Sequence, residues 1–483
     1  MNPTQLLWPG TEVYQRRFEK SGVASIAVRR ALEADRIAIA GRDQFLKLYD
    51  WVSRVDPKAF TRVWSDPVAF FWVRRAVHFL AACRGEPMGT VERAYCAHFG
   101  VESPREALRI HLADFKRFII ALAVVARRDI VFDEPYEASL PLSLPGTEFV
   151  LLGDEPVSIR GVSDGALELT NPPRFLPLSE SPSGSGVRIE SCPVVAVGDA
   201  RVLLNPALFN VPGIGFPIAW TTMPLELQSR YAAAATDALG VIRRFQPATF
   251  SHLESALHTI AFKPRDESFF NVSASELPGA FVCTVPPAEP YALASSFIHE
   301  FYHNTLFCIE EAGPFLETTE DDEIEGENHY SPWVDGLRPL HGIMHAVYVY
   351  LAVFRFWSAV LRDGSSDEGR LAYTREFIAR IPVQLRMGIN QLRRHARFTT
   401  FGLAIFEQMT REVDEIEVEA RMLGADLKTA VIGIDAKGTF RPFLRSGESR
   451  PMSAGEMLLE HMEKSDVNCE CAEEKAILVL ALS

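Results

Sequence analysis

Apolar residues recur at helical spacing over the first part of the chain. The clearest stripe follows residues 103–106 (Ser-Pro-Arg-Glu) and consists of Leu108, Leu112, Phe115, Ile119 and Leu122. Steps of four and three residues place such side chains on one face of a helix, and Ser-Pro-x-Glu is typical of a helix start with Pro at the first helical position. We therefore predict that residues 1–135 form an N-terminal helical region.

The pattern changes between residues 136 and 217. Short apolar runs at 149–152, 157–159, 187–189 and 194–197 are separated by Gly, Pro, Asp and Ser. Runs of this kind, bounded by turn-forming residues, are typical of short β-strands with tight turns. The sequence therefore predicts a β-rich region over 136–217, with a linker-like loop at 179–186.

Helical patterns return from residue 218 to about 425. Residues 225–245 predict one helix, and a second is expected to begin at Pro290, because no further Gly or Pro occurs until Gly313. A strand-like run at 280–285 precedes this second helix. The apolar stretch 342–361 is almost long enough to span a membrane, but it contains His345 and Arg355, so we predict a buried helix of a large core.

Together these patterns predict an α+β fold that is predominantly α-helical, with a central short-stranded β segment. The expected domains are the N-terminal helical region (1–135), the β-rich region (136–217), a helical metal-binding catalytic domain (218–425) and a weakly patterned C-terminal extension (426–483).

Composition and charge exclude several classes of protein. A chain of 483 residues with 47% hydrophobic and 23% charged residues is typical of a folded protein of two or three domains. The net charge of −14 argues against a nucleic-acid-binding surface. The seven cysteines are scattered and odd in number, and the N-terminus lacks the pattern of a signal peptide. We expect a cytoplasmic protein that inserts into no membrane, and the oligomeric state stays open.

The pattern most informative about chemistry is His-Glu-Phe-Tyr-His at residues 299–303, which lies in the helix predicted to begin at Pro290. Residues four apart leave one face of an α-helix one turn apart, so His299 and His303 can bind one metal ion together. Glu300 lies beside them and is the candidate catalytic residue, as a base or as support for a ligand. Two core histidines and a surface glutamate are the alternative interpretation.

Two histidines are too few for a tight metal site, so we expect a third ligand from a following helix. His345 is our first choice, since it lies on the next long helix. His341, one turn earlier on the same face, is the main competitor. Four carboxylates remain further alternatives: Glu310, Glu311, Glu325 and Glu327.

Arg338 and Trp333 precede the helix that carries His345. Pro339 suits the first position of that helix, so Arg338 should lie at the helix entrance, two turns from His345. A guanidinium at this place can bind a carboxylate through two hydrogen bonds. Trp333 is a candidate wall of the same pocket. A surface or salt-bridged arginine and a buried structural tryptophan are the alternatives.

Several of these motifs occur together in a known group of proteins. The helix 296–304 (SFIHEFYHN), followed by Tyr-Ser-Pro-Trp at 330–333, Arg-Pro-Leu at 338–340 and Gly-Ile-Met-His-Ala-Val-Tyr at 342–348, resembles the HExxH-motif putative peptide-modification family. The resemblance covers roughly residues 278–357 well and the N-terminal part more loosely. Members of this family are understood to be peptide β-hydroxylases that depend on Fe(II), 2-oxoglutarate and O2.

The resemblance implies a zincin-like arrangement, in which the helix of the pentad packs on a second ligand-bearing helix. It implies that His299, His303 and His345 bind the metal, that Arg338 holds the distal carboxylate of 2-oxoglutarate, and that the substrate is a ribosomally synthesised precursor peptide. Val334 stands where family members often carry Arg or Lys. Three histidines also differ from the two histidines and one carboxylate that are usual in non-haem iron oxygenases.

Two other functions stay open at the level of sequence. A zinc peptidase would use Glu300 as the general base on a zinc-bound water. A non-catalytic peptide-binding protein would carry a structural metal site closed by four protein ligands.

Overall fold

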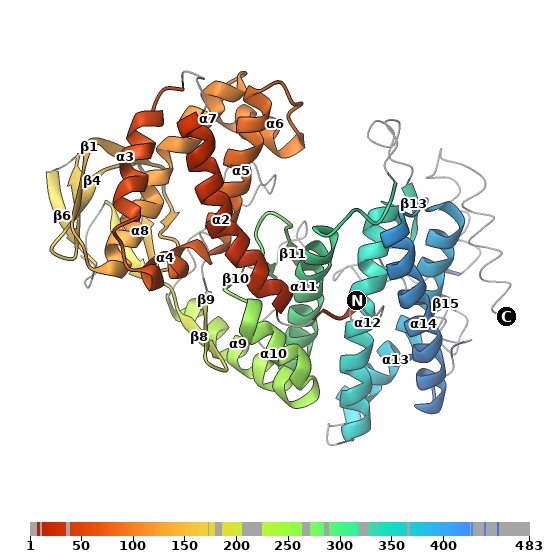
Figure 1. The fold of residues 1–483 in the computed structure, drawn as a ribbon. Helices are drawn as coiled ribbons and strands as arrows, with labels where there is room; N and C mark the ends of the chain where they lie inside the picture. Colours follow the sequence, from red (N-terminus) through yellow and green to blue (C-terminus); the bar gives the residue numbers. More distant parts are fainter. Residues whose placement is uncertain are drawn as a thin grey trace. The chain divides into compact units, whose positions relative to one another are not determined.

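The computed structural model describes residues 7–9, 12–34, 39–171, 173–178, 186–204, 225–262, 271–284, 289–317, 328–333, 336–364, 368–425, 427, 439–440 and 452–453. The acidic stretch that carries Glu325 and Glu327, Val334, most of the linker-like loop and most of the C-terminal extension lie outside these residues. The fold is α+β, with about 60% of the described residues in helices and the strands in several small sheets (Figure 1).

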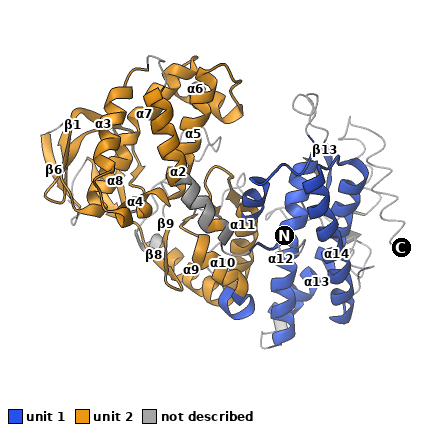
Figure 2. Ribbon diagram, viewed as in Figure 1, with its two compact units in different colours: residues 1–10, 242–247, 305–483 blue, residues 11–241, 248–304 orange. Residues whose placement is uncertain are grey.

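Two compact units make up the chain (Figure 2). Unit 2 contains residues 11–241 and 248–304, and unit 1 contains residues 1–10, 242–247 and 305–483. The four regions predicted from the sequence follow one another along the chain. Unit 2 combines most of the first two regions with the first part of the third, and unit 1 contains most of the rest.

Unit 2 begins with a group of helices: α2 (Glu12–Ala34), α3 (Arg42–Val52), α4 (Pro57–Trp64), α5 (Pro67–Cys83), α6 (Thr90–Phe99), α7 (Pro104–Ala113) and α8 (Phe115–Ala126). The predicted stripe lies on α7 and α8, and its five side chains are almost completely buried. The Ser103 hydroxyl caps α7 by accepting a hydrogen bond from the Glu106 backbone N–H at 3.2 Å, which confirms the predicted helix start. The helical region ends earlier than predicted, because Arg127 adopts a left-handed conformation (φ 52°) that ends α8.

Three sheets complete the β part of unit 2. The first has the order β1 (Ile130–Ala138), β4 (Val157–Ser163), β5 (Ala166–Thr170), β6 (Pro173–Pro177), and the second has the order β2 (Leu142–Ser143), β3 (Phe149–Leu152), β7 (Arg188–Ser191). The third has the order β11 (Val272–Ser273), β12 (Ala280–Cys283), β10 (Thr259–Phe262), β9 (Ala200–Leu204), β8 (Val194–Val197). Strands from both sides of residue 217 therefore share one sheet, because β9 and β10 pair in parallel across α9 (Leu225–Phe245) and α10 (Pro247–Ala256).

The helix α11 (Pro290–Glu310) follows β12 and carries the pentad. Its first half packs on the third sheet of unit 2, where the ring of Phe297 contacts Phe281 of β12 and Phe262 of β10. All four residues of β12 are fully buried. The pentad is thus carried by a helix whose position against the sheet is set by a dry, aromatic contact.

Unit 1 is mainly helical. It contains the hairpin of β13 (Asn328–Ser331) and β14 (Gly336–Pro339), the helices α12 (Leu340–Asp363), α13 (Glu368–His395) and α14 (Thr400–Met422), and the short strands β15 (Thr439–Phe440) and β16 (Met452–Ser453). The helix α12 is long and apolar enough to cross a membrane by length and composition alone, and 83% of its most apolar window is buried. It packs chiefly against α13.

Candidate functional site

The pentad lies on one continuous helix, as the sequence predicted. His299 and His303 leave the same face of α11 one turn apart, and their Nε2 atoms are 3.2 Å apart. The imidazole of His299 is about one quarter exposed (27%), so water reaches part of this side chain.

The separation of the two nitrogens fits a shared metal ion. Histidine nitrogens bind zinc at about 2.0–2.1 Å, and at that length a spacing of 3.2 Å corresponds to an angle of about 100° at the metal. That angle lies between the values for octahedral and tetrahedral coordination. The two side chains therefore fit a divalent cation in the arrangement that they already have.

Glu300 is buried beside this pair, with 2% of its surface exposed. Its Oε2 accepts a hydrogen bond of 2.7 Å from the Ser273 hydroxyl, and its Oε1 lies 3.9 Å from His299 Nε2. Burial raises the pKa of Glu300 to about 8, and the hydrogen bond from Ser273 opposes this rise. A cation bound to the two histidines would favour the ionised carboxylate.

Asn304 fixes the pentad helix to the sheet behind it. Its side-chain amide donates to the Ala280 carbonyl at 3.2 Å and accepts from the Gly279 N–H at 3.1 Å. Asn304 is 2% exposed, so both bonds are shielded from water. Two residues earlier on α11, the hydroxyls of Tyr302 and Thr249 are 3.1 Å apart and join α11 to α10. These contacts hold the histidine pair in place.

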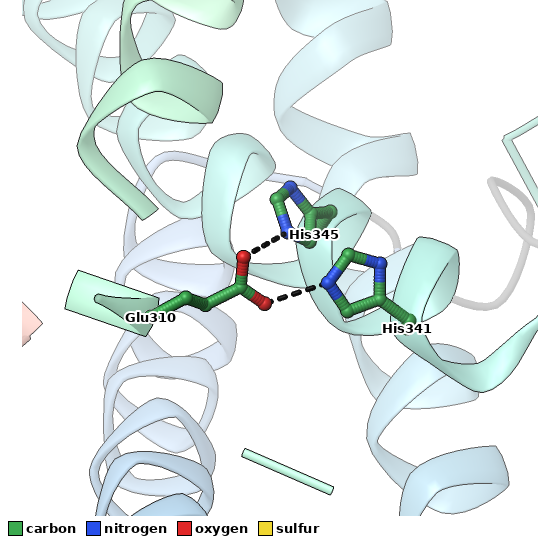
Figure 3. A group of neighbouring side chains, drawn as sticks. All are labelled: Glu310, His341 and His345. Carbon is green, nitrogen blue, oxygen red and sulfur yellow. Dashed lines mark hydrogen bonds and ion pairs between the residues drawn. The ribbon is translucent and has the colours of Figure 1, made fainter. Parts of the chain in front are cut away.

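In unit 1, Glu310, His341 and His345 form a second group of metal-ligand type (Figure 3). Glu310 accepts a hydrogen bond of 2.6 Å from His341 Nε2, and its other carboxylate oxygen lies 3.4 Å from His345 Nε2. One ligand atom from each residue lies within 4.8 Å of the other two. Three of the residues considered as the third ligand therefore come together at one place.

The protonation of this group suits ion binding. Burial alone would raise the pKa of Glu310, but the hydrogen bond from His341 and the interaction with His345 outweigh burial and lower the pKa to about 2. Burial lowers the pKa of His345, and its interaction with Glu310 opposes this shift. The ring of Phe307 packs on His345 with 4.7 Å between centroids, which contributes to that burial. An ionised carboxylate and a neutral imidazole are the forms that bind metals.

Arg338 and Trp333 lie in or next to the β13–β14 hairpin of unit 1. Arg338 is the third residue of β14 and pairs with His329 of β13, its side chain is exposed, and it pairs with no carboxylate among the described residues. The indole of Trp333 is 6% exposed, stacks on Tyr350 at 5.6 Å, and lies against Gly388. Arg338 is thus available to an anion, and Trp333 contributes to the packing of α12 and α13.

The predicted ligands divide between the two units. His299 and His303 belong to unit 2 and His345 belongs to unit 1, so the centre of three histidines stays a prediction. Glu311 is exposed. The sequence did not indicate Ser273 and Asn304 as site residues. Neither belongs to a motif, and their contacts depend on how β11 and β12 pair behind α11.

No protein-family model matches the chain, and no curated protein is detectably similar to it.

Proposed function

We propose that this protein is an Fe(II)- and 2-oxoglutarate-dependent β-hydroxylase of a ribosomally synthesised precursor peptide. The observation that carries the proposal is the convergence of the His299 and His303 nitrogens, 3.2 Å apart, beside the buried carboxylate of Glu300. The zincin-like packing of the pentad helix on a second ligand-bearing helix is part of this proposal.

In the proposed centre, His299 and His303 hold the metal and His345 supplies the third ligand. Bound iron, with 2-oxoglutarate and O2, supplies the oxidising power that hydroxylation of a side-chain β-carbon needs. The carboxyl group of Glu300 would stand beside the metal, since its Oε1 lies 3.9 Å from His299 Nε2, and it would hold or accept a proton of a group bound there. Ser273 and Asn304 keep this face of α11 in place.

Arg338 is the proposed partner of the distal carboxylate of 2-oxoglutarate. Its guanidinium is exposed, pairs with no acidic residue that the structure describes, and carries five N–H donors. A planar guanidinium binds a carboxylate through two parallel hydrogen bonds and also restricts its orientation. Trp333 lies five residues earlier, and a direct contact between Trp333 and the cosubstrate is part of the proposal.

A zinc peptidase is the second candidate, and one observation favours it. A carboxylate 3.9 Å from a metal-binding nitrogen can act as the general base on a metal-bound water. In that case Arg338 would bind a carbonyl or carboxylate of the substrate peptide.

The deciding experiment adds Fe(II) and 2-oxoglutarate to the metal-free full-length protein under anaerobic conditions. We expect a weak visible charge-transfer band that needs both additions. Arg338→Ala should weaken the binding of 2-oxoglutarate, whereas Arg393→Ala, a change of an exposed arginine at the end of α13, should leave it unchanged. Tight binding of zinc, peptide cleavage and no band would support the peptidase.

A further inference from the structure

The carboxylate of Glu300 depends on a single side chain for its orientation. Within the described part of the chain, the Ser273 hydroxyl is the one group that donates a hydrogen bond to it, at 2.7 Å. The same hydroxyl lies 2.8 Å from the backbone carbonyl of Glu300. Ser273 therefore touches both ends of the same residue.

This double contact selects one position of the Glu300 side chain. Because Ser273 holds Oε2 close to the backbone of α11, Oε1 is the oxygen that faces His299, 3.9 Å from its Nε2. A glutamate side chain has three rotatable bonds, and its terminal torsion is broad in the absence of a partner. Without the hydroxyl, no other hydrogen bond from the described residues would hold Oε1 on the side of the histidine pair.

Ser273 itself lies in a segment that is anchored to the N-terminal helices. It lies in β11, and the loop that follows is anchored by Glu276, whose carboxylate pairs with Arg75 at 2.9 Å and with Arg74 at 3.7 Å. Arg75 is 1% exposed and also pairs with the buried Glu92. An ion pair of this kind is costly to break because it would leave a buried charge without a partner.

The far end of the same loop is attached to the pentad helix. The Gly279 N–H donates to the side chain of Asn304, one turn beyond Glu300 on α11. The segment from Ser273 to Gly279 thus bridges the N-terminal helices and the histidine pair, with an anchor at each end. The position of the Ser273 hydroxyl is set by these anchors and not by Glu300 alone.

We propose that Ser273 is a positioning residue, which holds the carboxylate of Glu300 so that Oε1 faces the metal side of His299. This inference rests on the proposed metal centre at His299 and His303, but it holds for an oxygenase and for a peptidase alike. Partners that orient the groups around a metal typically contribute about 10–100-fold to metal affinity or activity.

The test is a titration of the metal-free full-length protein with Co(II), followed by its visible spectrum, and with Zn(II) in competition. Ser273→Ala should lower the affinity for both ions by about 10-fold or more and change the Co(II) spectrum. Ser273→Thr, which keeps the hydroxyl, should restore most of the affinity. Ser255→Ala, which removes a hydroxyl that donates to the Ser251 carbonyl on α10 and bonds no other described residue, is the matched control and should have no effect.

A double-mutant cycle with Glu300→Ala separates positioning from a general effect on folding. If Ser273 acts through Glu300, Ser273→Ala should not weaken metal binding further in the Glu300→Ala protein. An equal loss in both backgrounds, or a lower melting temperature with unchanged metal affinity and spectrum, would overturn the proposal. Failure of the unaltered protein to bind Co(II) or Zn(II) would overturn it too.

The same experiments separate this inference from the proposed function. If the unaltered protein binds Co(II) in a way that depends on Ser273 but develops no band with Fe(II) and 2-oxoglutarate, the role of Ser273 stands and the oxygenase assignment fails. If the band appears and Ser273→Ala leaves metal affinity and spectrum unchanged, the oxygenase stands and the positioning role fails.

Discussion

Glu300 and Glu310 lie on the same helix, one in each compact unit, and yet their carboxyl groups have opposite properties. Burial raises the pKa of Glu300 to about 8, against the hydrogen bond from Ser273. At Glu310 the interactions with the imidazoles of His341 and His345 overcome the effect of burial and lower the pKa to about 2. The difference comes from the partners, because both side chains are largely removed from water.

This comparison shows what a neighbouring histidine contributes. Glu300 is adjacent to His299 in the sequence, but the two side chains leave α11 in different directions and remain 3.9 Å apart. His341 is 31 residues from Glu310 along the chain and still donates a hydrogen bond of 2.6 Å. Proximity in sequence therefore does not predict which carboxylate hydrogen-bonds to a histidine. Glu310 is held as the ionised carboxylate, whereas burial favours the neutral acid at Glu300.

The largest expected effect shows whether the metal binds at the pair of His299 and His303 or at the group of Glu310, His341 and His345. His299→Ala and His303→Ala should each lower the affinity for Fe(II) or Zn(II) by more than about 100-fold, because each change removes a ligand of the proposed centre and not only a supporting partner. Metal content after dialysis and calorimetric titration are the measurements. His98→Ala, a change of an exposed histidine at the end of α6, is the control and should retain full affinity.

The same measurement on His341→Ala can break this assignment. If His341→Ala loses the metal while His299→Ala keeps it, the ion lies in the group of Glu310, His341 and His345, which has the two histidines and one carboxylate usual in non-haem iron sites.

The next effect concerns the stability of the metal-free protein at pH 7. Glu310→Gln should lower the free energy of unfolding by about 3 kcal/mol, because the lowered pKa of Glu310 contributes stability that is present above pH 4.5. Glu300→Gln should not lower it, since burial already favours the neutral acid and Gln can still accept from Ser273. Urea unfolding followed by circular dichroism measures both. Glu415→Gln, an exposed change on α14, is the control, and equal losses at 300 and 310 would contradict the comparison.

Acid should distinguish the two units by the pH at which each loses stability. In unit 2, burial lowers the pKa of His111 to about 3, and its Nε2–H donates to the Trp72 carbonyl at 2.7 Å. Because the folded pKa lies below the unfolded value of about 6.5, this contribution is present above pH 6.5 and is lost as the pH falls toward 3. At pH 5 the loss should be about 2 kcal/mol, while the contribution of Glu310 is still largely present.

Unfolding free energies at pH 7 and pH 5 test this difference. The loss between the two values should be about 2 kcal/mol smaller in His111→Gln than in the unaltered protein, because Gln has no proton to gain in this range. An unchanged loss would show that His111 takes up its proton in the folded state.

The smallest expected effects are changes in stability when one helical glycine from each unit is replaced by alanine. A Cβ at Gly388 on α13 would lie 2.6 Å from Trp333 and 2.7 Å from Val347, so Gly388→Ala should destabilise by about 1 kcal/mol after the gain in helix propensity. Nothing lies within 4 Å of a Cβ at Gly240 on α9, so Gly240→Ala should stabilise by about 0.5–1 kcal/mol. Thermal melting measures both, and a stabilising Gly388→Ala would mean that Trp333 can move away from α13.

Local pattern was enough to predict many individual elements. The helix α9 matches its predicted bounds of 225–245, and β3 and β8 match the runs at 149–152 and 194–197. These segments have strong periodicity or clear turn residues at their ends, so local physics determines them. The break between α7 and α8 at Asp114 was not predicted, because the hydrophobic stripe continues through it.

The sequence by itself determined the pentad geometry, since helical periodicity alone brings His299 and His303 to one face. It also determined which residues are chemically able to bind a metal or a carboxylate. Only the tertiary structure decided that Ser273 orients Glu300 and that Glu310 pairs with His341 and His345. These contacts join segments that are 27 to 35 residues apart, and they follow from strand pairing and helix packing, which local sequence does not encode.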